Sequence, residues 1–287
     1  MIYVLVPAHD EASTIGLLLW KIRRVFTAFE REYQLLVVDD ASTDGTADVL
    51  APYERALPLT VVAHRKRQGY ARSLEELLRL AVARSDRPRR DAAATIQADF
   101  SESPDDLPEM IKRFESGADL VLADGRHRPG RAGAERLARR LAPLALRPFT
   151  TLAQPEAGIG TLRVYRVGTL ARMLGRSGPL LHTDGWAADL ELLARAAAAA
   201  RRVEVVRLSS AVRPRERAVR LRPFRALLGA VLSAPGLPRA GRPSGAEDEA
   251  GPAPAPRRGR GRRGRRGRSG GGTHTAAPSG SAAAGPA

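Results

Sequence analysis

The 287 residues are 43% hydrophobic and carry a formal net charge of +16, a size that suits one domain of roughly 200 to 250 residues with a shorter appendage. The absence of cysteine excludes disulfides, cysteine-held zinc and thiol nucleophiles. No stretch reaches the roughly 18 consecutive apolar residues of a membrane-spanning helix, and the chain opens into a strand without a charged leader, so a cytoplasmic protein is expected.

Strands and helices alternate along the first part of the chain. The predicted strands cover residues 2–6, 33–39, 59–63, 93–99 and 118–124. The predicted helices cover residues 13–30, 45–55 and 70–84, and a further helix begins near Pro104. Asp44 is placed to cap the second helix, and proline suits the first turn of the last. This alternation predicts an α/β fold with a mostly parallel sheet flanked by helices.

Polar clusters follow the predicted strands at their carboxyl ends, where ligands bind in sheets of this kind. The clusters are PAHDE (7–11), DDASTDGT (39–46), HRKRQG (64–69), QADFSES (97–103) and DGRHR (124–128). All but HRKRQG contain a carboxylate, which can accept hydrogen bonds from a base or ribose or hold a hard cation that bridges phosphates. Each carboxylate taken alone is equally an ordinary turn or capping residue.

Common nucleotide and metal motifs are missing. GxGxxG does not follow the first strand, and GxxxxGK[ST] occurs nowhere, which disfavours dinucleotide-binding and P-loop proteins. The five histidines lack HExxH or similar spacing, so a metal is expected to have oxygen ligands.

Five motifs in order resemble those of the family 2 glycosyltransferases. VPAHDE followed by VVDDASTDGT resembles the family's VPxYNE and VDDGSxDGT pair. QADFSESPDDLPEMI, GTLRVYR (160–166) and GWAADLELLARA (185–196) resemble segments of its polyprenyl-phosphate hexosyltransferases, the dolichyl-phosphate mannose synthase type. The resemblance covers residues 1 to about 215. It implies a glycosyltransferase-A fold in which a nucleotide-sugar lies across the strand ends and an acceptor attacks the anomeric carbon with inversion.

The resemblance also implies roles for residues of the first two clusters. Pro7, His9 and Glu11 would line the nucleoside, with His9 in place of the usual tyrosine. Asp39 would accept a hydrogen bond from the base, and Asp40 would lie nearby.

The metal motif departs from the family pattern. Asp99 matches the second carboxylate of its Asp-x-Asp motif, whereas Gln97 stands at the first. One interpretation is that Asp99 holds Mg²⁺ or Mn²⁺, with Gln97 as a weaker ligand or a hydrogen-bond partner. The other is a metal-independent or inactive descendant. Mg²⁺ often takes only one or two carboxylates, with phosphate oxygens and waters as its other ligands, which favours the first interpretation.

The acceptor stays open between a polyprenyl phosphate and a hydroxyl group. A hydroxyl acceptor needs a base, and Asp189 is the candidate, but a lipid phosphate is already an anionic nucleophile. Asp189 and Glu191 lie roughly 200° apart on a predicted helix, so only one can face the site. Arginines favour the phosphate, although a solvated arginine face is the alternative. The candidate ligands of an acceptor phosphate are Arg126, Arg136, Arg140 and Arg163.

The predicted catalytic domain covers residues 1–215. Residues 216–235 are predicted to form an amphipathic or peripheral segment, too short to cross a membrane but suited to an anionic membrane surface. The Arg/Gly/Pro/Ala-rich tail, 236–287, is predicted to be disordered. The expected activity is hexose transfer to a polyprenyl phosphate at the cytoplasmic face of the membrane. A degenerate module that binds nucleic acid through the tail is the alternative from another class.

Overall fold

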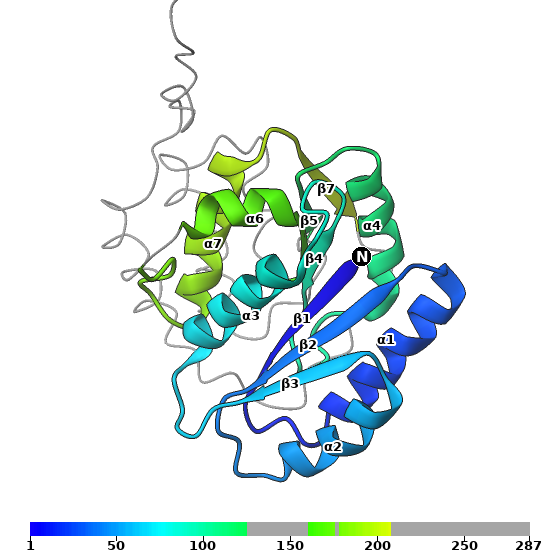
Figure 1. Ribbon diagram of the computed structural model, residues 1–287, viewed down its shortest axis with the longest axis vertical. Coiled ribbons are helices and arrows are strands. Elements are labelled where there is room, and N and C mark those ends of the chain that lie inside the picture. Colours follow the sequence, from blue (N-terminus) through cyan, green and yellow to red (C-terminus); the bar gives the residue numbers. More distant parts are fainter. Residues whose placement is uncertain (125–159, 176–177, 208–287) are drawn as a thin grey trace, which may run out of the picture. The chain divides into compact units, whose positions relative to one another are not determined.

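The computed structural model describes residues 1–124, 160–175 and 178–207 (Figure 1). The described strands are β1 Ile2–Ala8, β2 Tyr33–Asp39, β3 Leu59–Ala63, β4 Ala92–Thr95, β5 Leu120–Asp124, β6 Arg163–Arg166 and β7 Val203–Arg207. The described helices are α1 Ile15–Phe29, α2 Thr46–Ala56, α3 Tyr70–Arg84, the 3-10 turn η1 Pro104–Asp106, α4 Leu107–Glu115, α6 Val167–Leu174 and α7 Trp186–Ala199. None of these helices is long and apolar enough to cross a membrane.

Several predicted features lie outside the described residues. These are the segment 216–235, the tail 236–287, and the candidate phosphate ligands Arg126, Arg136 and Arg140. All of the described residues belong to one compact unit, Met1–Gly245.

The seven described strands form one sheet in the order β3-β2-β1-β4-β6-β5-β7. β1 pairs in parallel with β2 and β4, whereas β6 runs antiparallel between β4 and β5. The register places Ala8 opposite Asp39, and Asp39 opposite Ala63. The carboxyl ends of the first three strands therefore meet at one edge of the sheet. The predicted α/β fold with a mostly parallel sheet is confirmed.

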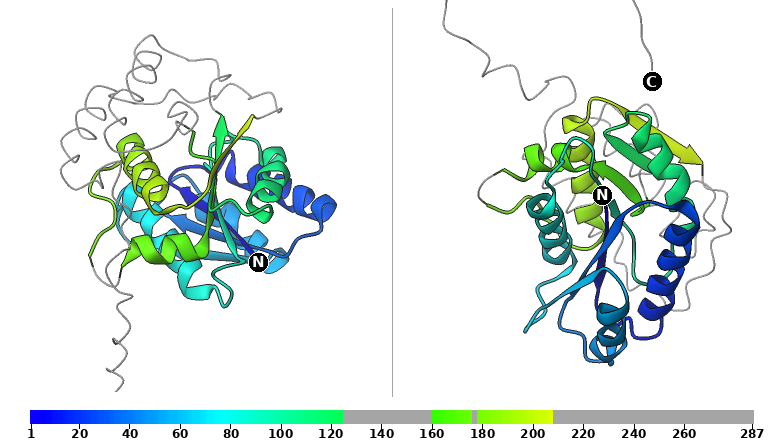
Figure 2. Two further views of the ribbon diagram at one scale, coloured as in Figure 1. Left: turned by 90° about the horizontal axis from the view of Figure 1, so that it is seen from above. Right: turned by 45° about the vertical axis from the view of Figure 1, so that its right-hand side comes forward.

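Helices cover both faces of the sheet. α1, α2 and α4 lie on one face, and α3, α6 and α7 lie on the other (Figures 1 and 2). Along β1, Val4 and Val6 belong to the first core, while Tyr3 and Leu5 belong to the second, because successive side chains of a strand point to opposite faces. A strand buried on both faces is apolar throughout, which explains the unbroken run IYVLV.

The predicted fourth strand is too long. It was expected over 93–99, but β4 ends at Thr95. The chain then turns: Phe100 adopts φ +58°, and Oδ1 of Asp99 accepts a hydrogen bond from the backbone N–H of Ser101 at 2.9 Å. Asp99 therefore lies on a turn beyond the strand, and Gln97 lies in the short segment that leads into it. The other predicted strand and helix limits up to Asp124 agree with the structure within two residues.

The apolar stripe of α1 offers a matched pair for testing the core. Leu19 is 0% exposed and Leu17 is 52% exposed on the same helix. Leu19→Ala should lower the free energy of unfolding by about 2 to 5 kcal/mol, because it removes buried methyl groups and leaves a cavity. Leu17→Ala should change it by less than about 0.5 kcal/mol. Urea denaturation of both variants checks this, and equal effects would contradict the described packing.

Candidate active site

The turns after β1 and β2 are cross-linked by hydrogen bonds. The carboxylate of Asp10 accepts from the backbone N–H of Thr43 at 2.8 Å, and the backbone N–H of Glu11 donates to Oγ1 of Thr46 at 2.9 Å. Oε2 of Glu11 accepts from the hydroxyl of Thr14 at 2.8 Å. Bonds between the two turns hold them in a fixed relation at the carboxyl edge of the sheet.

The residues predicted to line the nucleoside come together at this edge. Pro7 is buried in β1 opposite Val38 on β2. The ring of His9 donates from Nδ1 to the backbone oxygen of Asp40 at 2.8 Å. Asp39 is buried at the end of β2, and its Oδ1 accepts from the backbone N–H of Ser42 at 3.1 Å. Their contact with a nucleotide stays a prediction.

Asp40 has a supporting position at the same edge. Its Oδ1 accepts from the backbone N–H of Gln68 at 2.7 Å and its Oδ2 from that of Gly69 at 2.8 Å, and the ring of His64 contributes a further bond at 2.7 Å. Burial alone would raise the pKa of Asp40, but these bonds outweigh it and hold the pKa below its ordinary value. The carboxylate thus fixes the loop of residues 64–69, and its predicted place near the nucleotide stays a prediction.

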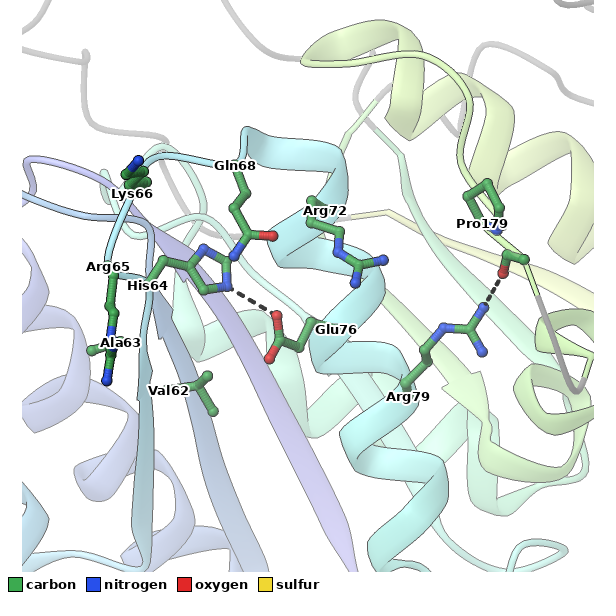
Figure 3. Close-up of a pocket in the computed structure, with 11 residues that line it drawn as sticks. Val62, Ala63, His64, Arg65, Lys66, Gln68, Arg72, Glu76, Arg79 and Pro179 are labelled. Atoms are coloured by element: carbon green, nitrogen blue, oxygen red, sulfur yellow. Dashed lines mark hydrogen bonds and ion pairs between the residues drawn. The ribbon is translucent and has the colours of Figure 1, made fainter.

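His64 joins this loop to α3. Its Nδ1 faces Asp40, and its Nε2 lies 2.9 Å from Oε2 of Glu76. The dashed line between His64 and Glu76 in Figure 3 marks the second of these contacts. Burial would lower the pKa of His64, but the two carboxylates raise it above its ordinary value. When the ring is protonated, it donates one N–H to each carboxylate.

A hollow lies beside His64, between the end of β3 and the exposed face of α3 (Figure 3). Its lining includes Arg65, Lys66 and Arg72, which make it electropositive. Arg79, also in the lining, is paired with Glu75 at 2.7 Å. Positive charge beside the strand ends attracts anionic ligands toward this edge.

Gln97, Tyr70 and Asp189 form a chain of hydrogen bonds. Nε2 of Gln97 donates to the hydroxyl of Tyr70 at 3.0 Å, and this hydroxyl donates to Oδ1 of Asp189 at 2.9 Å. The three residues come from the turn after β4, the start of α3 and the first turn of α7. The turn that carries Asp99 is thereby connected to the motif on α7, and Gln97 is a hydrogen-bond partner, one of its two predicted roles.

Asp189 is buried, and this changes its acidity. Burial raises the pKa of Asp189 to about 7, although the charge of Arg163 and the hydrogen bond from Tyr70 lower it. Glu191, two residues on, instead accepts from the backbone N–H of His182 at 2.9 Å. The two carboxylates have different partners, in agreement with their predicted separation around the helix.

Arg163 lies inside the protein. It is 1% exposed, and its Nη1 donates to the backbone oxygen of Asp189 at 2.8 Å. In this structure it supports the segment that carries Asp189. Its predicted contact with an acceptor phosphate stays a prediction.

Glu102 is a supporting residue that the sequence did not reveal. Its carboxylate accepts from the backbone N–H groups of Thr161 and Leu162, both at 2.8 Å, and from the hydroxyl of Thr161 at 2.7 Å. These bonds tie the turn after Asp99 to the entry of β6. Glu102 stands among the acidic residues of QADFSES, and its only sequence signal was that clustering. Tyr70 was likewise missed, although it directly follows the cluster HRKRQG.

The family model described as glycosyl transferase family 2 matches residues 3–173. The chain belongs to this family. The resemblance found in the motifs is thereby confirmed. An undecaprenyl-phosphate 4-deoxy-4-formamido-L-arabinose transferase of Pseudomonas paraeruginosa (strain DSM 24068 / PA7) is 27% identical over 174 residues, covering 61% of this chain and 49% of that protein. The chain spans about half the length of the curated relatives it matches.

Solved structures share the fold of this family 2 glycosyltransferase. Mannosyl-3-phosphoglycerate synthase from Rubrobacter xylanophilus has a TM-score of 0.57 at 19% identity, covering 82% of this chain and 73% of that one. Glucosyl-3-phosphoglycerate synthase from Mycobacterium tuberculosis, in complex with Mn²⁺, UDP-glucose and phosphoglyceric acid, has a TM-score of 0.56 at 20% identity, covering 84% and 82%. The predicted glycosyltransferase-A fold is confirmed.

The raised pKa of His64 predicts a pH-dependent contribution to stability. A raised pKa in the folded protein stabilises it fully below the unfolded value of about 6.5, and this contribution is lost as the pH rises through the folded pKa. The loss of unfolding free energy caused by His64→Gln should therefore be largest near pH 5.5 and should shrink toward pH 9. Urea denaturation across this range measures it. A loss that is the same at every pH would contradict the described ion pairs.

Proposed function

We propose that this family 2 glycosyltransferase binds a nucleoside diphosphate sugar across the carboxyl ends of β1, β2 and β4. It transfers the sugar, a hexose, with inversion at the anomeric carbon to a polyprenyl phosphate. The observation that carries the proposal is the chain Gln97–Tyr70–Asp189, because it brings the turn of Asp99 next to the α7 motif. The donor, bound at the turn of Asp99, and the acceptor, bound beside the motif on α7, would then lie next to each other.

The donor nucleoside would lie against Pro7, His9 and Glu11, with Asp39 accepting from its base. The support for this placement is their position on two interlocked strand-end turns. The loop held by Asp40 forms the next part of the same edge. Its basic residues provide positive potential for the diphosphate.

A divalent cation, Mg²⁺ or Mn²⁺, would bind at Asp99. The described residues contain no group of three or more His, Asp or Glu side chains suited to a metal. A cation that takes one carboxylate from Asp99 and its other ligands from the diphosphate and water is within the ordinary coordination of Mg²⁺. The oxygen donor of this turn therefore fits a metal that arrives with the nucleotide. When bound, such an ion neutralises negative charge on the leaving nucleoside diphosphate.

The acceptor proposal is supported by the curated relatives, which are named undecaprenyl-phosphate transferases. A phosphate acceptor is already anionic, so its attack needs no base. A carboxyl group with a pKa of about 7 can hold a proton as the phosphate arrives, which reduces repulsion between the two. Asp189 would then accommodate the acceptor, and the further ligands we propose for its phosphate are Arg126, Arg136, Arg140 and Arg163.

One observation favours a second candidate, transfer to a hydroxyl of a saccharide. A general base works best when its pKa is near the operating pH, and the pKa of Asp189 is about 7. In that reaction Asp189 would take the proton of the attacking hydroxyl.

The cellular setting follows from the acceptor. A polyprenyl phosphate resides in a membrane, so we place the reaction at its cytoplasmic face, with segment 216–235 against the anionic surface. Removal of residues 236–287 tests the alternative role in nucleic-acid binding: sugar transfer should persist, and a salt-dependent RNA affinity should disappear if the tail binds RNA.

Asp99→Ala should lower metal-stimulated transfer by roughly 100-fold or more, because one charged ligand at the leaving group is lost. Transfer of labelled sugar from UDP-sugars and GDP-sugars to undecaprenyl phosphate, with and without Mg²⁺ or Mn²⁺, measures this. Asp105→Ala is the matched control, since that carboxylate is exposed and paired with Lys21. Full metal-dependent activity in Asp99→Ala would refute the metal assignment.

Asp189→Asn separates the two acceptor classes. With a phosphate acceptor, the rate should fall less than about 10-fold, whereas loss of a general base should lower it roughly 100-fold to 10,000-fold. The assay compares undecaprenyl phosphate with saccharide acceptors at saturating donor. A large loss with the lipid phosphate would overturn the assignment of an acceptor that needs no base.

A further inference from the structure

The hydroxyl of Tyr70 lies between Gln97 and Asp189, two residues whose roles the family pattern leaves open. It accepts from Gln97 at 3.0 Å and donates to Asp189 at 2.9 Å. Burial raises the pKa of Tyr70 well above its ordinary value, and the neighbouring Asp189 adds to the shift. The phenol therefore keeps its proton and remains a donor.

The direction of this chain is set by what each group can donate. A tyrosine hydroxyl has one proton, an ionised carboxylate only accepts, and the NH₂ of a glutamine side chain only donates. When the single proton of Tyr70 is given to Asp189, the phenol oxygen needs a donor on its other side. Gln97 supplies that donor. An aspartate at position 97 would place a second acceptor and a second negative charge against the phenol.

The backbone of Asp189 is fixed independently of its side chain. Nη1 of Arg163 donates to the backbone oxygen of Asp189 at 2.8 Å, and Arg163 is itself buried on β6. Among the described residues, the carboxylate of Asp189 accepts its hydrogen bond from the hydroxyl of Tyr70. Buried polar networks of this kind restrict their members to one geometry. Tyr70 thus controls the direction of the carboxylate.

We propose that Tyr70 and Gln97 are positioning residues for Asp189, and that Gln97 orients the Tyr70 hydroxyl instead of binding the metal. Asp99 is then the carboxylate of this turn that meets the cation. The substitution of glutamine for the family's usual aspartate is explained by the donor that Tyr70 requires. The inference rests on the proposed function, since it assigns a task within the same site.

Three variants test the inference: Tyr70→Phe removes the hydroxyl, Gln97→Met removes the donor, and Gln97→Asp restores the usual carboxylate. With undecaprenyl phosphate, each should lower kcat by about threefold to 10-fold, no more than Asp189→Asn does, because the lost hydrogen bond disturbs the orientation of Asp189 without removing its carboxylate. The KM for the donor sugar nucleotide should change less than about threefold. Affinity for Mn²⁺ in the presence of UDP, measured by electron paramagnetic resonance, should not tighten in Gln97→Asp.

The double variant Tyr70→Phe/Gln97→Asp gives a second readout. Because both residues act through one hydroxyl, it should be no more than about threefold slower than the slower single variant. If the loss of kcat in the double variant equals the product of the two single losses, the residues act independently, and the proposal is overturned. Tighter Mn²⁺ binding in Gln97→Asp, together with full activity in Tyr70→Phe, would overturn it in favour of a metal site at position 97.

Tyr3→Phe is the matched control. The buried Tyr3 donates its hydroxyl proton to the backbone oxygen of Arg84 at 3.0 Å, at the other end of α3. Tyr3→Phe therefore loses a hydrogen bond comparable to that of Tyr70, but it should keep the wild-type kcat. Thermal unfolding of each variant verifies its fold, and Gln97→Met provides the kinetic test if Tyr70→Phe does not fold. A wild-type chain that neither transfers nor hydrolyses a donor sinks the proposed function, whereas an active wild type with an equally active, folded Tyr70→Phe sinks only this inference.

Discussion

The in-register parallel pairing of β1 with β2 is the constraint on which the site depends. It sets Ala8 level with Asp39, so the turns that follow both strands begin at the same height. β1 also pairs with β4, and the turn after β4 carries Asp99. Helices bury both faces of these strands, which leaves the carboxyl edge as the place where polar side chains can gather without a desolvation cost. Strand register therefore sets the position of the site, and the individual side chains then determine its chemistry.

The buried acids around this edge divide by their partners. Asp40 and Glu102 each accept backbone N–H groups from a loop distant in sequence, and Glu191 accepts one from the segment just before its own helix. Such bonds satisfy the loop backbone and fix its course, and removing one would leave buried donors unmatched. Asp189 instead accepts from the hydroxyl of Tyr70, and its pKa is raised to about 7. The other three acids fix loops, whereas Asp189 has the raised pKa that makes it the candidate for chemistry in our proposal.

The sequence predicted local features well and long-range pairings poorly. Strands 33–39 and 59–63 and helix 70–84 were predicted with their observed limits, because apolar runs and periodicity are properties of neighbouring residues. The end of β4 was missed because the buried apolar residues Ile96 and Ala98 continue the pattern of a strand, although strand pairing ends at Thr95. Strands β6 and β7 received no prediction from the pattern. Tyr70 and Asp189 are 119 positions apart in the sequence, and Glu102 and Thr161 are 59 positions apart. The spacing of residues in a single sequence contains no signal for such contacts.

Binding of nucleoside diphosphates tests the central claim most directly, because it needs neither the acceptor nor the correct sugar. Calorimetric titration of UDP, GDP and dTDP into the full chain, with and without Mn²⁺, compares the wild type with Asp99→Ala. The account predicts that one nucleotide binds the wild type at least about 10-fold more tightly with Mn²⁺, and that this gain disappears in Asp99→Ala. Failure of all three nucleotides to bind, or a gain from Mn²⁺ that is unchanged in Asp99→Ala, would contradict it.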